Sequence, residues 1–239
     1  MCTLTYLPSD GGFAMVSSRD EMRARGPMEP PVHDRDRGAL YPVDVRSGGT
    51  WLLTATSGFT VNLLNGGYER HAPGGPYRHS RGLVPLLFAE AGGIDAFLST
   101  FDPRGIEPFT LVVVTHARRS ITELVWTGER MDRNERDPEL PCIWSSSTLY
   151  DATTRDMRAG WFHEVTRAQA QRSPIEVLFD FHRDGGRGLA PQDRTIHMSR
   201  PHGPETVALV GVVHDRTEWT LRYHDLVRAE QRIIRLIGS

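Results

Sequence analysis

The grouping of strand-like segments is the feature that most constrains the fold of this 239-residue chain. Segments with alternating or continuous apolar residues come in twos and threes, and segments with apolar residues at helical spacing lie between these groups. Short turns join the strands inside a group. We therefore expect an α+β protein in which two stacked antiparallel sheets are covered by helices.

The expected elements follow from periodicity and turn residues. Strands are expected over residues 3–7, 13–17, 51–55, 59–64, 109–115, 120–126, 142–146, 195–199, 207–213 and 218–223. Helices are expected over residues 80–91, 94–100, 152–171, 174–181 and 226–237. The proline-rich, charged segment 22–48 and the glycine-rich segment 66–79 are expected to be loops. At this length we expect one domain, residues 1–239.

The chain contains no lysine, so all 28 cationic side chains are arginines. A Schiff-base lysine, a phosphate-loop lysine and a Ser-Lys dyad are therefore excluded. The formal net charge is -2, and the charges are spread along the chain instead of forming blocks. We expect no binding to nucleic acid.

The cysteine content indicates a reducing compartment. Cys2 and Cys142 are too few for a disulfide framework, and Cys142, in an apolar strand context, reads as a small buried residue. No run approaches the roughly 18 apolar residues that span a bilayer, and no secretory signal is evident. We expect a cytoplasmic protein without stable membrane insertion; its oligomeric state is not readable.

Cys2 is the most informative single residue. It follows the initiator methionine and is small enough for routine removal of Met1, which leaves a thiol and an α-amino group on one residue. The α-amine titrates near ~8 and can accept the thiol proton directly or through water. Nucleophile and base then belong to the same residue.

Three charged residues are expected beside Cys2 if residues 3–7 and 13–17 form a hairpin. Arg19 would favour the thiolate, while Asp20 and Glu21 point to opposite sides of a strand. One acid would orient Arg19 and the other would hold the terminal ammonium, and the sequence leaves the assignment open. On this spacing alone, an Arg-Asp-Glu run is also typical of a solvated turn.

Taken together, these segments resemble the NRDE family, the homologues of transport and Golgi organisation protein 2. The resemblance covers about the first ninety residues and continues more faintly beyond them. The matching segments are Met1-Cys2, Ser18-Arg19-Asp20-Glu21 with Arg25, Gly48-Gly49-Thr50-Trp51-Leu52, Gly58 with Asn65, Ser80-Arg81-Gly82-Leu83-Val84, and Ser199-Arg200.

The family is similar in pattern to the N-terminal-nucleophile hydrolases. This resemblance implies a four-layer αββα sandwich with Cys2 as nucleophile at the start of a central strand. It also implies that Asn65 and the backbone N–H of Gly66 bind an oxyanion, and donors of this kind typically contribute a factor of about 10² to 10³ in kcat. Without the resemblance, Asn65 reads as a turn asparagine.

The resemblance further implies a substrate site. Its expected residues are Glu21, Trp51, Gly66, Arg81 and Ser147, beside the expected catalytic residues Cys2, Arg19, Asp20 and Asn65. Three departures from the family pattern affect it. Ser18 and Ser147 stand where the family usually has asparagine, and Asn65 is followed by Gly66-Gly67 instead of tyrosine. Loss of the amide at Ser147 removes a group that could position a substrate or an oxyanion.

The predicted function is hydrolysis of a non-peptide C–N amide bond in a small molecule, without a cofactor. The alternative implied by the resemblance is a non-catalytic protein that handles haem or lipid, with Cys2, His71 or His79 contacting iron. A metal site is not expected, because neither His71 with His79 nor His197 with His202 has helical i, i+4 spacing.

Overall fold

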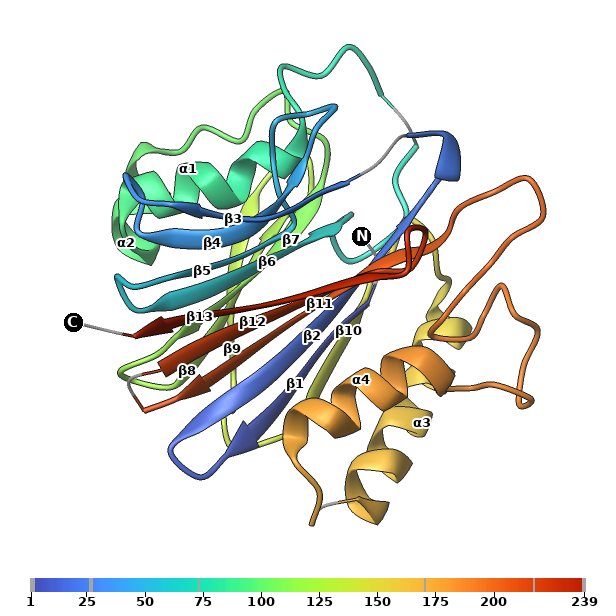
Figure 1. Cartoon of the computed structure of the whole chain (residues 1–239). Coiled ribbons are helices and arrows are strands. Elements are labelled where there is room, and N and C mark those ends of the chain that lie inside the picture. The colour runs from blue at the N-terminus through green and yellow to red at the C-terminus, as the bar shows by residue number, and fades with distance from the viewer. Residues whose placement is uncertain (1–2, 26–27, 73, 170, 217, 238–239) are drawn as a thin grey trace. The chain divides into compact units, whose positions relative to one another are not determined.

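The computed structural model describes residues 3–25, 28–72, 74–169, 171–216 and 218–237. They form two compact units (Figure 1). The terminal unit contains Met1–Arg25 and Pro138–Ser239, and the central unit contains Gly26–Asp137. Each unit contains one antiparallel sheet and its own helices. That the two units form a single domain stays a prediction.

The sheet of the terminal unit has the order β10-β1-β2-β11-β12-β13. Its strands are β1 (Thr3–Ser9), β2 (Gly12–Glu21), β10 (Cys142–Ser145), β11 (Glu205–Asp215), β12 (Glu218–Asp225) and β13 (Glu230–Ile237). β1 is an interior strand, with β10 on one side and β2 on the other. The expected N-terminal hairpin is confirmed.

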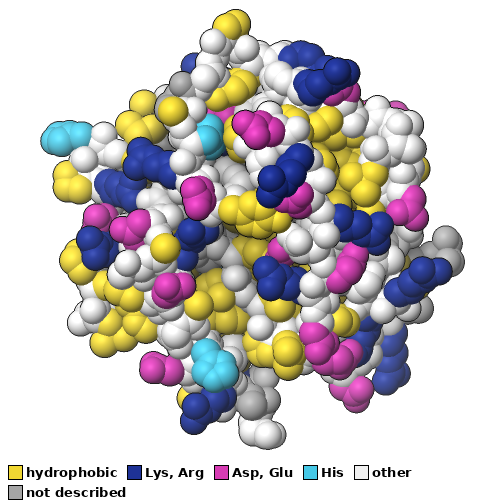
Figure 2. All heavy atoms as spheres, turned by 180° about the vertical axis from the view of Figure 1, so that it is seen from behind, with side chains coloured by type: hydrophobic (Ala, Val, Ile, Leu, Met, Phe, Trp, Pro, Cys, Tyr) yellow, Lys and Arg dark blue, Asp and Glu magenta, His cyan; other side chains and the backbone are white. Residues whose placement is uncertain are grey.

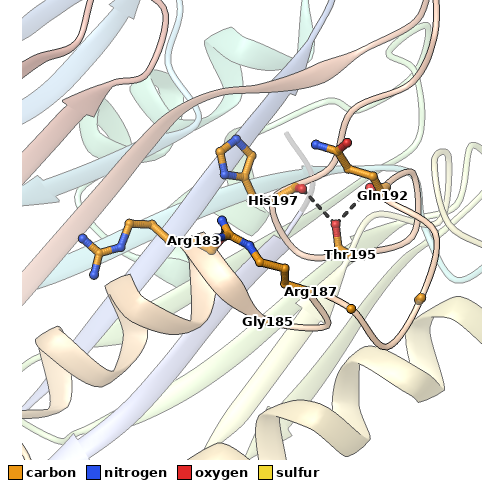
Figure 3. Close-up of a pocket in the computed structure, with 8 residues that line it drawn as sticks. Arg183, Gly185, Arg187, Gln192, Thr195 and His197 are labelled. Atoms are coloured by element: carbon orange, nitrogen blue, oxygen red, sulfur yellow. Dashed lines mark hydrogen bonds between the residues drawn. The ribbon is translucent and has the colours of Figure 1, made fainter.

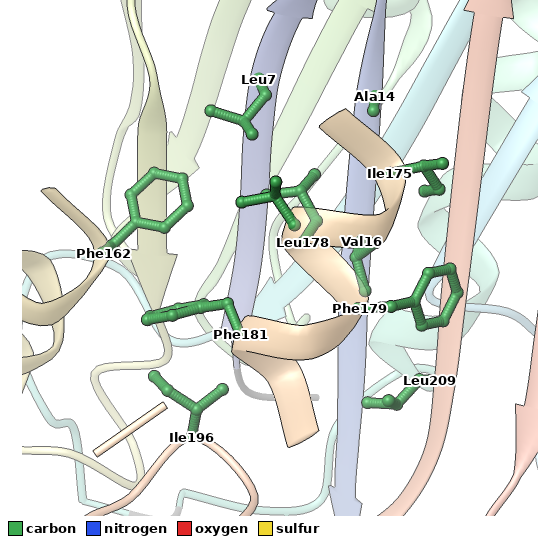
Figure 4. Packing of buried hydrophobic residues seen from close by; sticks show 11 residues of the cluster. Leu7, Ala14, Val16, Phe162, Ile175, Leu178, Phe179, Phe181, Ile196 and Leu209 are labelled. Atoms are coloured by element: carbon green, nitrogen blue, oxygen red, sulfur yellow. The ribbon is translucent and has the colours of Figure 1, made fainter. Parts of the chain in front are cut away.

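Two helices cover one face of this sheet, α3 (Ala152–Ala168) and α4 (Pro174–Asp184). α4 begins with proline at its first turn, as its sequence predicts. Figure 4 shows the apolar side chains of α4 against those of the strands beneath it. The buried cluster comprises Leu7, Ala14, Val16, Phe162, Ile175, Val177, Leu178, Phe179, Phe181, Ile196 and Leu209.

The sheet of the central unit runs in sequence order from β3 to β9. Its strands are β3 (Met28–Asp34), β4 (Ala39–Asp44), β5 (Leu52–Ala55), β6 (Phe59–Asn65), β7 (Phe109–Thr115), β8 (Ser120–Trp126) and β9 (Met131–Arg136). Because each strand pairs with the next along the chain, short turns are sufficient for most connections. The α+β class with two antiparallel sheets is thus confirmed.

Helices α1 (Val84–Ala91) and α2 (Ile94–Thr100) follow a short 3₁₀ turn, η2 (Arg81–Leu83), which the Ser80 hydroxyl caps by accepting from the Gly82 N–H. A row of aromatic contacts joins these helices to the sheet. It runs through Phe59, Phe88, Phe97, Phe101 and Phe109, with ring centroids 4.4 to 6.2 Å apart.

Among the described residues, no single helix combines the length and the apolar composition of a membrane span. The segments Arg81–Ala91 and Ile94–Thr100, bent by 117°, pass that test only as a pair, on length and composition alone.

The prediction of a loop over residues 22–48 is wrong, because β3 and β4 form a hairpin there. Prolines are tolerated at this place for two reasons. β3 is the edge strand of its sheet, and its register shifts between Glu29 and Val32, which brackets Pro30 and Pro31. The charged segment after β8 also contains a strand, β9, that the sequence analysis missed.

The prediction of a C-terminal helix over residues 226–237 is also wrong. Asp225 Oδ1 accepts hydrogen bonds from the N–H groups of Val227 and Arg228, which starts a turn, and Ala229 completes it with φ 55°. β13 then pairs with β12 along its whole length. Residues 195–199 do not form the expected strand; Ser199 makes only an isolated bridge with Glu205.

Surface charges are paired locally. Figure 2 shows arginine and acidic side chains interspersed over one face of the molecule. On β9 the pairing follows the strand, since Arg133 Nε lies 2.9 Å from Glu135 Oε1 two residues along. Exposed pairs of this kind contribute little to stability.

His182 is a buried histidine that α4 presents to the sheet. Its side chain is fully buried, and Nε2 lies 2.9 Å from the Thr5 hydroxyl. Burial, helped by the positive charge of Arg158, lowers the pKa of His182 to about 3. His182 is therefore neutral in the folded protein at neutral pH.

We predict that the free energy of unfolding falls as the pH drops below the pKa of an unfolded histidine, about 6.5. The folded pKa of His182 is lower, about 3, so the unfolded chain binds one more proton between the two values. His182 alone then contributes a slope of up to about 1.4 kcal/mol per pH unit. Urea unfolding between neutral and mildly acidic pH measures this slope.

His182→Gln should reduce that slope by about one proton, whereas His163→Gln, at an exposed position on α3, should leave it unchanged. Equal slopes for the wild type and His182→Gln would contradict the assignment.

Candidate functional site

The start of β1 is held on both sides by backbone pairing. Thr3, the first described residue, is paired with Ser18 on β2 and with Ser145 on β10. Side chains alternate between the faces of a strand. Thr5 contacts His182 of α4, so Thr3, Thr5 and the Asp20 side chain belong to the helix-covered face, and Arg19 and Glu21 belong to the opposite face.

Asp20 is a buried carboxylate with two hydroxyl donors. Only 3% of Asp20 is exposed. Tyr150 donates its hydroxyl to Oδ2 at 2.6 Å, and Thr206 donates to Oδ1 at 2.7 Å. Thr206 Oγ1 in turn accepts from the Met198 N–H at 3.0 Å. This network fixes the end of β2 against β11 and against the segment before α3.

Arg158 of α3 lies beneath the start of β1. Its guanidinium is fully buried and has three acceptors: the Thr3 hydroxyl at 2.9 Å, the Arg194 carbonyl at 3.0 Å and the Thr195 carbonyl. Its Cζ also lies 3.4 Å from the centroid of the Tyr150 ring, a cation–π geometry. These contacts offset part of the large cost of burying a charge.

Arg19 and Glu21 form a second polar group on the opposite face of β2. Arg19 is 4% exposed, and its Nη2 lies 3.7 Å from Glu21 Oε2. The same Glu21 oxygen lies 3.3 Å from Nη1 of Arg25. The two neighbouring acids therefore have different partners: hydroxyl groups for Asp20 and guanidinium groups for Glu21.

Ser147 lies in the segment between β10 and α3 and is 4% exposed. This segment turns back on itself, because the Ser146 carbonyl accepts from the N–H groups of Leu149 and Tyr150. The turn delivers the Tyr150 ring to Asp20. Arg200 reinforces it by donating to the Leu149 carbonyl at 2.7 Å.

In the central unit, two predicted site residues, Gly66 and Arg81, share one carbonyl group next to Asn65. Asn65 is the last residue of β6, and the Gly66 N–H after it donates to the Pro108 carbonyl at 2.9 Å. Arg81 donates to the same Pro108 carbonyl at 3.0 Å and pairs with Glu107 at 2.8 Å. The Gly66 N–H, expected to face an oxyanion, is thus engaged within the protein, and Arg81 positions the end of β6.

In the segment Gly49-Thr50-Trp51, the backbone lies directly against the backbone of η2. A Cβ on Gly49 would lie 2.3 Å from the carbonyl carbon and oxygen of Gly82, and the Thr50 N–H donates to that carbonyl at 2.8 Å. Only glycine allows this approach at position 49. The Trp51 side chain is fully buried, which makes it part of the packing of this unit and not an open contact for substrate.

Cys2 lies outside the described residues, so the structure does not test its expected role. Both histidines of the haem alternative have partners within the protein. His71 Nε2 lies 3.0 Å from Glu107 Oε1, and His79 Nδ1 lies 3.0 Å from the Ser80 carbonyl oxygen. These contacts give no support to iron binding by either histidine. Within the described ranges, no group of three or more His, Cys, Asp or Glu side chains is placed to hold a metal ion.

Tyr150, Arg158 and Thr206, the residues that fix Asp20 and Thr3, were not predicted from the sequence. A signal for Arg158 was present. The fully buried stripe of α3 consists of Thr154, Arg158 and Phe162, at i, i+4 and i+8, and an arginine on a buried stripe indicates a structural or functional partner.

The fold defined by these two sheets and their helices is that of the N-terminal-nucleophile hydrolases. The chain is similar to conjugated bile acid hydrolase from Clostridium perfringens, with 10% identity, a TM-score of 0.56, and coverage of 98% of this chain and 92% of the other. That structure is a cysteine-to-alanine mutant; an arginine-to-leucine variant of the same enzyme has a TM-score of 0.55, with the same identity and coverage.

A third similar structure is the Caenorhabditis elegans orthologue of N-acylethanolamine-hydrolyzing acid amidase, with 11% identity, a TM-score of 0.53, and coverage of 88% of this chain and 92% of the other. Identities this low establish the fold alone. No curated protein matches the chain in sequence. The family itself is shown by a match to the Transport and Golgi organisation 2 family over residues 1–210. The chain belongs to this family, as the motif segments predict.

We predict that Gly49→Ala destabilises the protein by about 2 kcal/mol, because the added Cβ overpacks the contact with Gly82. Thermal or urea unfolding measures the change. Gly160→Ala, at an exposed position within α3 where an added Cβ meets no atom within 4 Å, serves as the control and should not destabilise the protein. Equal stability of the two variants would contradict the backbone contact.

We predict that Arg158→Met lowers the free energy of unfolding by about 3 kcal/mol, because it leaves buried carbonyl and hydroxyl acceptors without a donor. Arg167→Met, on an exposed part of the same helix, should change stability by less than about 0.5 kcal/mol. Amide hydrogen exchange should also accelerate at Thr3 and Thr5 in Arg158→Met. Unchanged exchange there would show that Arg158 does not hold the start of β1.

Proposed function

We propose that this protein is an N-terminal cysteine hydrolase that cleaves a non-peptide C–N amide bond of a small molecule. Removal of Met1 frees the thiol and α-amine of Cys2. The observation that carries the proposal is the pairing of Thr3 with Ser18, directly before the buried Arg19 and Asp20 of β2. Family membership and the fold shared with two amide-cleaving enzymes support it.

We assign the roles on the basis of the alternation of side chains along the strands. Arg19 follows Ser18, the residue that pairs with Thr3, and its side chain lies on the face of β2 opposite to that of Asp20. We therefore assign Arg19 to the thiolate or to a substrate carboxylate, with Glu21 orienting its guanidinium at 3.7 Å. Asp20, on the other face, is assigned to the α-amino group. Glu21 and Asp20 thus receive separate roles in the proposal, whereas the sequence alone leaves open which acid has which role.

The proposed reaction proceeds in two steps. The Cys2 sulfur attacks the amide carbonyl carbon while the α-amine takes the thiol proton. The C–N bond breaks as that proton passes to the leaving amine, and a thioester with the acyl group remains. Water then hydrolyses the thioester, which releases a carboxylic acid and restores the thiol.

The side-chain amide of Asn65 is assigned to the oxyanion. The Gly66 N–H donates to Pro108, so this assignment depends on the Asn65 side chain alone. Arg81 acts through Pro108 and Glu107 by keeping the end of β6 in place. The reaction uses no cofactor, and the low cysteine content favours a cytoplasmic location.

We predict that Cys2 reacts faster than an ordinary thiol with an acylating reagent. The experiment uses a Cys142→Ser background, which leaves Cys2 as the sole thiol, and p-nitrophenyl acetate as the reagent. Intact mass should show one acetyl group at residue 2, and the apparent pKa from the pH dependence of the rate should lie below the usual ~8.5.

Variants separate the roles. Arg19→Gln should raise that apparent pKa, because the cation no longer favours the thiolate, whereas Arg25→Gln should move it less. Cys2→Ala should remove acylation altogether. An ordinary thiol pKa in the wild type, unchanged by Arg19→Gln, would contradict the proposal, and a Soret band lost in Cys2→Ala would favour haem handling.

A further inference from the structure

A pocket in the terminal unit lies between the end of α4 and the segment that follows it (Figure 3). Its volume is about 340 Å³, which is at the lower end of the range for small-molecule sites. It is lined by Arg183, Gly185, Arg187, Gly188, Ala190, Gln192, Thr195 and His197. None of these residues has a role in the proposed hydrolysis.

The lining contains two arginines and a histidine but no acidic residue. Figure 3 shows Arg187 extending back to the end of α4, where it lies between Arg183 and His197 in this view. The acids that pair with the two arginines are Asp180 and Asp184 of α4. Both arginines are more than half exposed, and such pairs exchange partners at little cost.

The walls of the pocket are fixed before any ligand binds. Gly186 has φ 78°, and a Cβ there would lie 2.3 Å from the Trp161 ring, so the turn is tight and takes only glycine. The Thr195 hydroxyl lies 2.9 and 2.8 Å from the carbonyl oxygens of Gln192 and His197. Arg158 holds the Arg194 and Thr195 carbonyls from behind.

We propose that this pocket binds a small organic anion through a carboxylate or phosphate group. Arg183 and Arg187 contact its oxygens, since guanidinium groups bind such oxyanions in a bidentate manner. Gln192 and His197 offer further polar contacts on the facing wall. The backbone around the pocket is already fixed, so binding orders mainly the two arginine side chains. The inference does not depend on the hydrolase activity.

The same Arg158 that holds the pocket wall also contacts the Thr3 hydroxyl at 2.9 Å. The pocket and the start of β1 therefore share one buried side chain.

Isothermal titration calorimetry tests the proposal with three probes of similar size: benzoate, phenyl phosphate and the neutral benzamide. At least one of the two anions should bind saturably at millimolar concentration, and the stronger one identifies the preferred group. Benzamide should bind about tenfold more weakly or not at all.

The double variant Arg183→Gln, Arg187→Gln should weaken anion binding by about tenfold or more, while Arg167→Gln, on exposed α3, should leave it unchanged. Circular dichroism and urea unfolding verify that the double variant is folded. Absence of anion binding to the wild type, equal binding of benzamide, or unchanged binding by the folded double variant would each overturn the proposal.

Discussion

The start of β1 depends on the contacts that the buried guanidinium of Arg158 makes. A buried charge is costly unless its donors are satisfied, and here it contacts two carbonyls, one hydroxyl and the face of Tyr150. The same Tyr150 hydroxyl donates to Asp20. One arginine and one tyrosine thus join helix α3, strand β1 and strand β2, and a local loss of this contact affects all three.

The central unit uses its motif residues in a similar, indirect way. Gly49 allows its backbone to meet that of Gly82, and Arg81 and Gly66 share the Pro108 carbonyl. These contacts set the conformation at the end of β6, where Asn65 lies. Most of the motif residues in this unit therefore serve as positioning residues, and Asn65 is the one we assign to direct chemistry.

The sequence predicts the regular parts of the fold well. Helix Ile94–Thr100 and strands Phe109–Thr115 and Ser120–Trp126 have the expected bounds, because each has a clear apolar period and a short turn. Three of the strands that were missed or misassigned, β3, β9 and β13, are edge strands. Prolines on β3 and exposed apolar residues on β13, such as Ile233, are tolerated there, so composition and spacing resemble those of a loop or a helix.

The candidate site can be predicted from the sequence only in part, and the reason differs from the one that applies to the fold. Arg19 and Asp20 are recognisable because they lie close to Cys2 in the chain, whereas Tyr150, Arg158 and Thr206 reach the same place from more than a hundred residues away. Such contacts depend on which helix stripe is buried. Met157, Trp161 and Val165 also have helical spacing and are the more apolar stripe of α3, but the buried stripe contains Arg158.

The proposed chemistry requires that residue 2 carries a free amine beside its thiol. The intact mass of the protein, produced from its own start codon in the cytoplasm, measures this most directly. We predict a mass lower by one methionine residue, with an unmodified N-terminal cysteine. A mass that retains Met1, or an N-terminus blocked by acetylation, would contradict the claim, because no amine would then be available to accept the thiol proton.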